Sequence, residues 1–270
     1  METKDYEKDG ILYCGICNKP KERRSAINES EIIPSLCDCQ GEARDQEQGQ
    51  WQAKQRMMKI ADMRTESIKD KERRNCRFEV AEENEYVVRC KQYVDQWEIV
   101  KRENIGLMFW GPCGNGKSFC AACIANALID RGIPSLMTSL PAILSDQNNI
   151  MEIVRQMKEY ELVVIDDLGA ERQSEYALEK TFLVIDERYK TGKPLIVTTN
   201  QKYQDMKEMR DKGDVAHSRI YDRILDMCTP IAFSEANRRR EPQKRKREIL
   251  KEVFANTMAK KKERYAKYEV

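Results

Sequence analysis

The pattern of apolar and polar positions predicts alternating helices and strands from residue 86 onward. Apolar residues recur at helical spacing from Tyr86 to Val100, which predicts a helix. Helical patterns also cover residues 118–128 and 176–190. Short apolar runs, each of a length suited to a buried strand, occupy residues 106–110, 135–138, 162–165 and 195–200. This alternation predicts an α/β fold in which helices cover both faces of a parallel sheet, a three-layer α/β/α arrangement.

Polar residues dominate the segment 43–77, which is rich in Gln, Lys, Arg, Glu and Met and contains no proline. Its apolar residues keep no sustained heptad, so a coiled coil is not predicted. We expect a long exposed helix or a pair of helices that joins two modules. The expected division is a small N-terminal module, a charged helical linker, the α/β domain and a basic C-terminal extension, at residues 1–42, 43–77, 78–241 and 242–270.

The composition is that of a soluble and very polar protein, with 40% hydrophobic and 35% charged residues. No stretch approaches 18 consecutive apolar residues, which excludes a transmembrane helix and a membrane partner. The first residues are charged and lack an apolar region, so no signal peptide is predicted. A cytoplasmic protein is therefore expected.

Charge is distributed unevenly, although the net charge is only +2. Residues 234–270 hold 13 Lys/Arg and 6 Asp/Glu, a local charge of +7 that leaves −5 for residues 1–233. A basic tail on a mildly acidic body suggests contact with a polyanion or an acidic protein. A solvated charged helix explains the same composition equally well.

Residues 111–118 form a complete G-x-x-x-x-G-K-[ST] phosphate-binding loop. Its glycines let backbone N–H groups converge on phosphate oxygens, while Lys117 reaches the β- and γ-phosphates and Ser118 ligates Mg²⁺. The strand before the loop and the helix after it supply the expected context, because the positive end of the helix dipole faces the phosphates. The expected ATP-binding residues are Gly111, Pro112, Cys113, Gly114, Asn115, Gly116, Lys117, Ser118 and Phe119.

Two acidic residues, Asp166 and Asp167, follow the apolar run 162–165. A buried parallel strand would deliver them to the phosphate end of the sheet. We expect Asp166 to hold Mg²⁺ through the water shell of the metal, and Asp167 to polarise the water that attacks the γ-phosphate.

Asn200 and two arginines complete the candidate catalytic set with Lys117 and the two aspartates. Asn200 ends a predicted strand, where it either reaches the γ-phosphate or caps the following turn. Arg219 and Arg223 lie four residues apart on one helical face. An arginine in that position can neutralise transition-state charge at the ATP of a neighbouring subunit, and surface ion pairing is the alternative.

Four cysteines near the N-terminus have the spacing of a zinc site. Cys14-Gly-Ile-Cys17 and Cys37-Asp-Cys39 are separated by 19 residues, and two short thiolate turns can supply the four corners of a tetrahedron. A thioredoxin-like redox pair is the main alternative, but no βαβ pattern surrounds Cys14 and Cys17. Bound zinc would let about 40 polar residues fold without much of a core.

Taken together, these segments resemble the AAA+ ATPases of the DnaC/DnaI helicase-loader type, with their phage-encoded relatives and the IstB-like transposition ATPases. The resemblance runs from about Phe78 to Arg239. A zinc-binding module ahead of the ATPase is also similar to the loader arrangement, in which that module grips the replicative helicase. The most specific matching pieces are residues 106–118, 164–171, 185–189, 196–200 and 218–223.

The resemblance implies a role for the residues of the phosphate site. Lys117 and Ser118 would be Walker A residues, and Asp166 and Asp167 would be the Walker B pair. Asp167 stands where most AAA+ proteins have Glu, and the side chain that is one methylene shorter implies slow turnover.

Three further roles follow from the same resemblance. Asn200 would be the polar sensor-1 residue. Arg219 or Arg223 would be the finger that acts in trans, with a slight preference for Arg223 as the second arginine of the R-x-x-x-R pattern. The basic tail beyond Pro242 extends past the usual end of the family, so nothing carries over to it.

The implied function is an ATP-dependent loader of the replicative hexameric helicase onto single-stranded DNA in bacterial or phage replication, with hydrolysis releasing the loader. ATP, Mg²⁺ and Zn²⁺ are the expected cofactors, and the ATPase domains are expected to self-associate. One alternative is an IstB-like ATPase that binds duplex DNA and assists a transposase, although the N-terminal cysteines favour the loader. Another is a small-molecule P-loop kinase, which needs an acceptor pocket and a basic lid.

Overall fold

The computed structural model describes residues 4–27, 31–145, 150–169 and 174–234. The chain forms two compact units, Met1–Asp62 and a second unit that begins at Met63, ahead of the expected boundary at Phe78. The basic extension expected at residues 242–270 lies outside the described residues. In the described part of the chain, no helix is long and apolar enough to cross a membrane.

The first unit contains two small antiparallel sheets. Strands β1 (Tyr6–Lys8) and β2 (Ile11–Tyr13) form a hairpin, and β3 (Glu22–Arg24) pairs with β4 (Ile32–Pro34). Asp9 and Gly10, at the turn of the first hairpin, both have positive φ (52° and 73°), as a tight two-residue turn between twisted strands requires. These strands are only three residues each, so they bury little apolar surface by themselves.

One helix, α1 (Asp38–Ser67), occupies most of the segment for which the composition predicts a long helix or a pair of helices. The helix is 30 residues long and polar on all sides, and Ser67 at its end is its one buried residue. Apolar side chains on it remain exposed, as Trp51 shows with 63% of its surface accessible. Polarity around the whole circumference is typical of a helix that spans solvent between modules.

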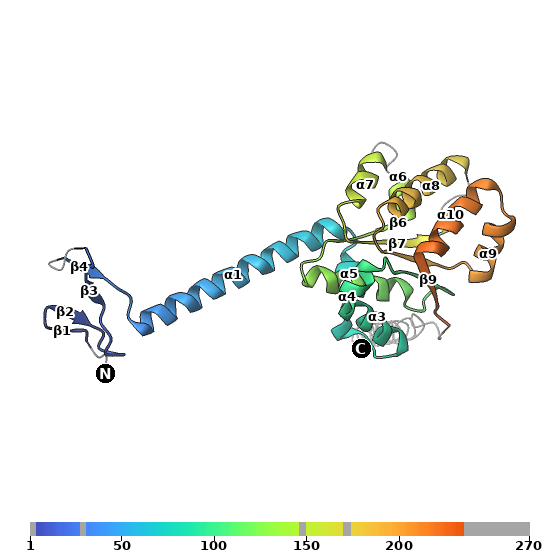
Figure 1. Ribbon diagram of the computed structural model, residues 1–270. Helices are drawn as coiled ribbons and strands as arrows, with labels where there is room; N and C mark the ends of the chain where they lie inside the picture. Colours follow the sequence, from blue (N-terminus) through green and yellow to red (C-terminus); the bar gives the residue numbers. More distant parts are fainter. Residues whose placement is uncertain (1–3, 28–30, 146–149, 170–173, 235–270) are drawn as a thin grey trace, which may run out of the picture. The chain divides into compact units, whose positions relative to one another are not determined.

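The second unit is built on a five-stranded parallel sheet with the strand order β6-β7-β8-β5-β9. Figure 1 labels β6, β7 and β9 of this sheet. Four of its strands confirm the predicted ones: β5 has the predicted bounds, β6 and β7 run further, and β8 ends one residue earlier. The sequence analysis missed β9, an edge strand that contains Pro230; the edge is where a sheet tolerates a residue without an N–H. The strands are β5 (Gly106–Trp110), β6 (Ser135–Ser139), β7 (Leu162–Leu168), β8 (Leu195–Thr199) and β9 (Cys228–Ala232).

Two groups of helices cover the sheet. The first group consists of α2 (Lys71–Arg74), α3 (Glu85–Asp95), α4 (Trp97–Arg102) and α5 (Lys117–Asp130). The second consists of α6 (Leu140–Ser145), α7 (Ile150–Met157), α8 (Glu175–Lys190), α9 (Tyr203–Lys212) and α10 (Val215–Met227). The helix predicted from Tyr86 to Val100 is therefore two helices, divided at Gln96.

Alternate strand residues show that the two groups lie on opposite faces. Val163 and Ile165 on β7 belong to one core with the side chains of α6, α7, α8 and α10. The residues between and beside them, Leu162 and Val164, are fully buried but lie outside that core. Because successive side chains of a strand point to opposite faces, this alternation confirms the expected α/β/α layers.

The segment from Met63 to Arg77 packs against β6 and α5. Ile68 is fully buried and forms a bridge with Met137 at the sheet edge. The side chain of Asn126 in α5 donates to the backbone oxygens of Arg73 (2.8 Å) and Cys76 (3.0 Å). This part of the expected linker is thus a structural element of the second unit.

Candidate functional site

The phosphate-binding loop joins β5 to α5 and lies at the carboxyl ends of the parallel strands. Gly111 has φ 138°, and a Cβ atom there would lie 2.4 Å from the carbonyl oxygen of Phe233, so no larger residue fits. Gly116 has φ 92° and directly precedes α5. The backbone N–H groups of the first turn of α5 are therefore available to an anion, as the motif predicts.

Lys117 is buried, and its ammonium group is held at the centre of the loop. Its Nζ donates to the carbonyl oxygens of Gly111 and Pro112, both at 2.8 Å, and to Oδ1 of Asn200 at 2.9 Å. The predicted Walker A lysine and the predicted sensor residue are thus in direct contact. These three hydrogen bonds use all three donors of the ammonium, so phosphate oxygens would take the place of the loop carbonyl oxygens when a nucleotide binds.

Asp166 and Asp167 lie where β7 departs from regular pairing with β8. Asp166 is buried, and its Oδ1 accepts a hydrogen bond from the hydroxyl of Thr198 on β8. The same hydroxyl accepts a hydrogen bond from the backbone N–H of Asp167 at 3.0 Å. This one hydroxyl therefore holds both acidic residues in place. It helps to fix Asp167 at φ 56°, a conformation that is uncommon outside glycine.

One pocket of about 990 Å³ contains most of these groups. Its polar side is formed by the phosphate loop together with Asp167 and Asn200. The rest of its lining is mixed. Val80, Ala81, Tyr86, Phe119 and Phe233 supply apolar surface, and Glu72, Arg73, Glu82 and Asn84 supply polar side chains. A pocket that offers both kinds of surface suits a nucleotide, which has charged phosphates and a flat base.

The residues present fit ATP with a divalent cation. The loop offers converging N–H groups and the ammonium of Lys117 to the phosphates. Ser118 at the start of α5 and the carboxylate of Asp166 supply oxygen ligands of the kind that Mg²⁺ prefers. The volume is at the upper end of the range of about 300–1,000 Å³ that is usual for small-molecule sites.

The structure places Arg219 and Arg223 away from this pocket, since neither of them lines it. Arg219 is exposed on α10. Arg223 donates from Nε to Oδ1 of Asp186 at 2.7 Å, and its guanidinium lies over the ring of Phe182, 4.8 Å from the centroid. Arg223 therefore forms an ion pair within its own chain, which is the alternative role that the sequence left open for the two arginines.

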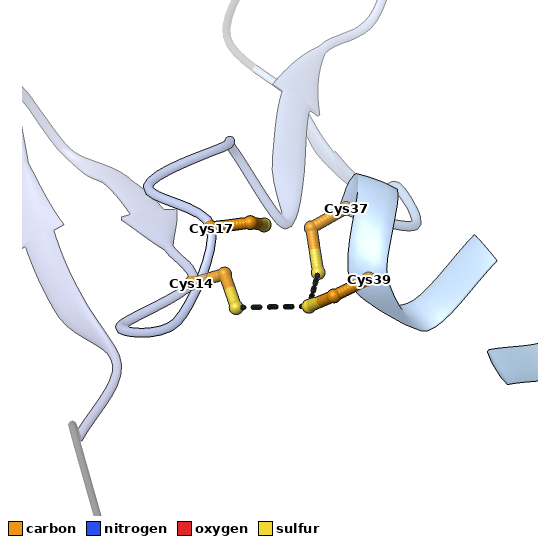
Figure 2. Close-up of side chains that lie close together, drawn as sticks. All are labelled: Cys14, Cys17, Cys37 and Cys39. Carbon is orange, nitrogen blue, oxygen red and sulfur yellow. Dashed lines mark hydrogen bonds between the residues drawn. The ribbon is translucent and has the colours of Figure 1, made fainter. Parts of the chain in front are cut away.

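The four cysteines of the first unit come together as predicted (Figure 2). Cys14 and Cys17 lie on a turn after β2, and Cys37 and Cys39 lie at the start of α1. Within the first turn, the N–H of Asn18 donates to the carbonyl oxygen of Cys14, and Asn18 has φ 56°, which folds the chain back sharply. The four sulfur atoms all lie within 4.8 Å of one another.

Backbone N–H groups directed at two of these sulfur atoms favour thiolates. The pKa of Cys17 is lowered to about 6, chiefly by the backbone N–H of Cys39. The pKa of Cys14 is lowered by the N–H groups of Cys17 and Ile16. The pKa of Cys39 is raised to about 12, chiefly by its hydrogen bonds with the other three cysteines. The cluster therefore concentrates negative charge that a cation can neutralise.

The geometry and the donor set both fit zinc. Tetrahedral zinc with Zn–S bonds of about 2.3 Å separates its sulfur ligands by about 3.8 Å. Sγ of Cys39 lies 3.4 Å from Sγ of Cys14 and from Sγ of Cys37. All ten cysteines of the chain are free thiols. The cluster can hold a zinc ion, and among the described residues around Cys14 and Cys17 there is no βαβ unit to support the redox alternative.

Comparison with known proteins identifies the family. The model of the IstB-like ATP binding proteins matches residues 42–247, which include the whole phosphate site. The chain belongs to the IstB-like ATP binding protein family. ATP binding follows from membership of this family.

The curated relatives of this IstB-like protein include helicase loaders. It is 26% identical to the replicative helicase loader DnaI of Bacillus subtilis over 147 residues, 50% of this chain and 47% of DnaI. It is 26% identical to the replicative helicase loader DnaC of Escherichia coli over 146 residues, 50% of this chain and 57% of DnaC. The chain thus spans about half the length of the curated relatives that it matches.

The second unit of this IstB-like protein also shares its fold with a solved loader. The crystal structure of the DnaC helicase loader matches with a TM-score of 0.52 and 21% sequence identity, over 61% of this chain and 100% of that chain. This likeness establishes the fold, and it agrees with the parallel sheet and the phosphate loop described above.

Two polar residues of the phosphate site, Thr198 and Arg73, were not predicted from the sequence. Thr198 left a signal, since it is a hydroxyl residue inside an otherwise apolar strand, and a buried hydroxyl needs a partner. No sequence signal marks Arg73, because it belongs to a run of charged residues in the segment expected to be an exposed linker. The structure places Arg73 on the pocket wall, with Nη2 3.1 Å from Oδ2 of Asp166.

Proposed function

We propose that this IstB-like protein is an ATP-hydrolysing loader that places a replicative DNA helicase on single-stranded DNA. The observation that carries the ATPase part is the meeting of Lys117, Asp167 and Asn200 at one pocket beside the phosphate loop. The loader part is supported by the similarity to DnaI and DnaC, which are replicative helicase loaders.

Each polar residue of the pocket has a task in hydrolysis. Lys117 binds the β- and γ-phosphates once its ammonium releases the loop carbonyl oxygens of Gly111 and Pro112. Ser118 and Asp166 would hold Mg²⁺, which would neutralise charge on the phosphate oxygens. Asp167, at the pocket wall, orients the attacking water and accepts its proton. Asn200 donates its amide N–H₂ toward the γ-phosphate while its Oδ1 accepts from Lys117.

An arginine from a neighbouring copy of the chain would neutralise the negative charge that develops on the γ-phosphate in the transition state. Arg219 is exposed on α10, whereas Arg223 is engaged by Asp186 and Phe182. We therefore assign the trans-acting role to Arg219 and the role of orienting α10 against α8 to Arg223. Because neither residue lines the pocket of its own chain, such a finger can act only after the ATPase domains self-associate.

The first unit is the proposed contact with the helicase. A zinc ion held by Cys14, Cys17, Cys37 and Cys39 would keep its short strands in one arrangement. Exposed apolar side chains on this unit, such as Ile16 with 74% of its surface accessible, offer a partner apolar area. Single-stranded DNA would bind to the ATPase domains through basic and aromatic side chains.

The test is helicase loading by the purified protein with ATP, single-stranded DNA and the helicase of its own replication system. Lys117→Ala should abolish ATP binding and DNA-stimulated hydrolysis, because it removes the cation that binds the phosphates. Lys212→Ala, which removes an exposed lysine at the end of α9, is the matched control and should load normally. Normal loading by Lys117→Ala would rule out the proposed mechanism.

The transposition ATPase remains the second candidate because the matched family model is that of IstB-like proteins. The two functions differ in the partner that the protein recruits and in the DNA that it prefers. Affinity purification of the full chain from its native cell should recover a hexameric helicase, together with hydrolysis stimulated by single-stranded DNA. Recovery of a transposase, with stimulation by duplex DNA, would establish the transposition function.

A further inference from the structure

Arg73 reaches the phosphate site from a short helix that precedes the expected ATPase domain. The side chain of Asp70 caps this helix, α2, by accepting from the N–H of Glu72 at 2.8 Å. At the other end, Asn126 of α5 holds the carbonyl oxygen of Arg73 itself at 2.8 Å. Because α5 is also the helix that begins at the phosphate loop, Arg73 is positioned by the same element that binds the phosphates.

The guanidinium of Arg73 occupies one oxygen of the Asp166 carboxylate. Nη2 of Arg73 lies 3.1 Å from Oδ2, while Oδ1 accepts from the hydroxyl of Thr198. The Asp166 side chain is only 7% exposed and that of Arg73 is 24% exposed, so water screens this pair weakly. The ion pair joins residues 93 positions apart and lies at the pocket that Arg73 lines.

Asp166 presents an electrostatic problem to a nucleotide. A buried carboxylate beside a triphosphate repels it, and the repulsion is large where the local dielectric constant is low. Two cations can remove this repulsion, a metal ion on the carboxylate or the guanidinium of Arg73. Both can bind Oδ2, and Oδ1 already accepts the hydroxyl of Thr198.

We propose that Arg73 is a positioning residue that neutralises the carboxylate of Asp166 while the nucleotide binds and then releases Oδ2 of that carboxylate to magnesium. Arg73 thereby sets how strongly the affinity for ATP depends on magnesium. The proposal rests on the proposed function only in taking ATP with magnesium as the ligand of this pocket. It applies equally to a loader and to a transposition ATPase.

The test is ATP affinity measured by isothermal titration calorimetry on the full chain, once in EDTA and once in saturating magnesium chloride. Arg73→Ala should weaken ATP binding in EDTA by about 10-fold, because Asp166 is left without a counter-charge. In saturating magnesium the same variant should change ATP affinity by less than about 3-fold, because the metal neutralises the carboxylate. Arg73→Lys should recover part of the affinity in EDTA.

The matched control is Lys71→Ala, which removes the same charge from the exposed side of the same helix and should leave both affinities unchanged. In an Asp166→Asn background, Arg73→Ala should weaken metal-free binding much less, because no carboxylate charge remains to be neutralised. Thermal unfolding of each variant checks the fold, and Arg73→Gln replaces Arg73→Ala if the latter unfolds.

Three results would overturn the proposal. Equal loss of affinity in EDTA and in magnesium would make Arg73 a plain phosphate ligand. No change in either condition would make the ion pair structural, and an undiminished effect in the Asp166→Asn background would show that Asp166 is not its target. Failure of the wild-type chain to bind ATP would instead contradict the proposed function.

Discussion

At the scale of single residues, the second unit depends on an arginine outside the phosphate site. Arg188 on α8 is 1% exposed, and its guanidinium donates to four backbone oxygens: those of Met157, Tyr160, Glu161 and Pro194. Burial lowers its pKa to about 10, so the group stays charged at neutral pH. It ties the end of α7 to the chain just before β7 and β8, the two strands that carry Asp166 and Asn200 to the site.

Replacing Arg188 should therefore cost much more stability than replacing a surface lysine of the same helix. Arg188→Met keeps the apolar length but leaves several buried carbonyl oxygens without donors, which we expect to lower the free energy of unfolding by about 3–5 kcal/mol. Lys190→Ala removes an exposed ion-pairing residue and should cost less than about 1 kcal/mol. Urea unfolding followed by tryptophan fluorescence measures both, and similar losses would contradict the assigned role.

At the scale of elements, α5 serves two purposes. It begins at the end of the phosphate loop, and its C-terminal half binds the segment that contains Arg73. Asn126 is fully buried in a helix that is apolar on nearly all sides, and it makes hydrogen bonds with Arg64 as well as with Arg73 and Cys76. Asp130, one turn later, forms an ion pair with Arg64.

Asn126→Leu tests this second purpose of α5. Leucine has a similar volume but cannot donate, so the backbone oxygens of Arg73 and Cys76 each lose one hydrogen bond. Each keeps another donor, the N–H of Cys76 at 3.2 Å for Arg73 and Nη1 of Arg77 at 3.0 Å for Cys76, so the expected cost is about 1–3 kcal/mol in unfolding free energy. Amide hydrogen exchange should also speed up over residues 71–77. Asn75→Ala, at an exposed position of that segment, is the control. Unchanged exchange over residues 71–77 in Asn126→Leu would show that other contacts hold the segment.

At the scale of the whole molecule, the two units have separate means of stabilisation. The second has a core of strand and helix side chains between its layers, which includes Met108, Val163 and Val197. Among its described residues the first has few buried apolar side chains, and its buried Cys14 and Cys37 belong to the cysteine cluster. We therefore expect metal to be required for folding only in the first unit.

Metal removal should separate the two units experimentally. The wild-type chain should bind about one zinc ion, and Cys14→Ser should lose it because three thiolates hold zinc much less tightly than four. The affinity for ATP should remain unchanged in that variant, since residues 63–234 keep their own core. Cys113→Ser, which changes a cysteine outside the cluster, should retain the metal. A wild-type chain that folds without metal, or loss of ATP binding in Cys14→Ser, would contradict this division.

The sequence by itself determined the features that depend on local order. The phosphate loop, the buried strands β5 to β8 and the paired cysteines are each specified by residues close together in the chain, because dihedral preferences, hydrophobic periodicity and ligand spacing act over short distances. The edge strand β9 was not predicted because Thr229 and Pro230 interrupt its apolar pattern.

Only the tertiary structure decided which distant residues contact each other at the site and that Arg73 joins them. The Lys117–Asn200 contact joins positions 83 apart, and the Arg73–Asp166 ion pair joins positions 93 apart. No periodicity marks Arg73, which lies in a run of charged residues like those of a solvated linker. It becomes part of the site because Asn126 anchors its backbone to α5, and such an anchor exists only once the sheet and its helices have packed.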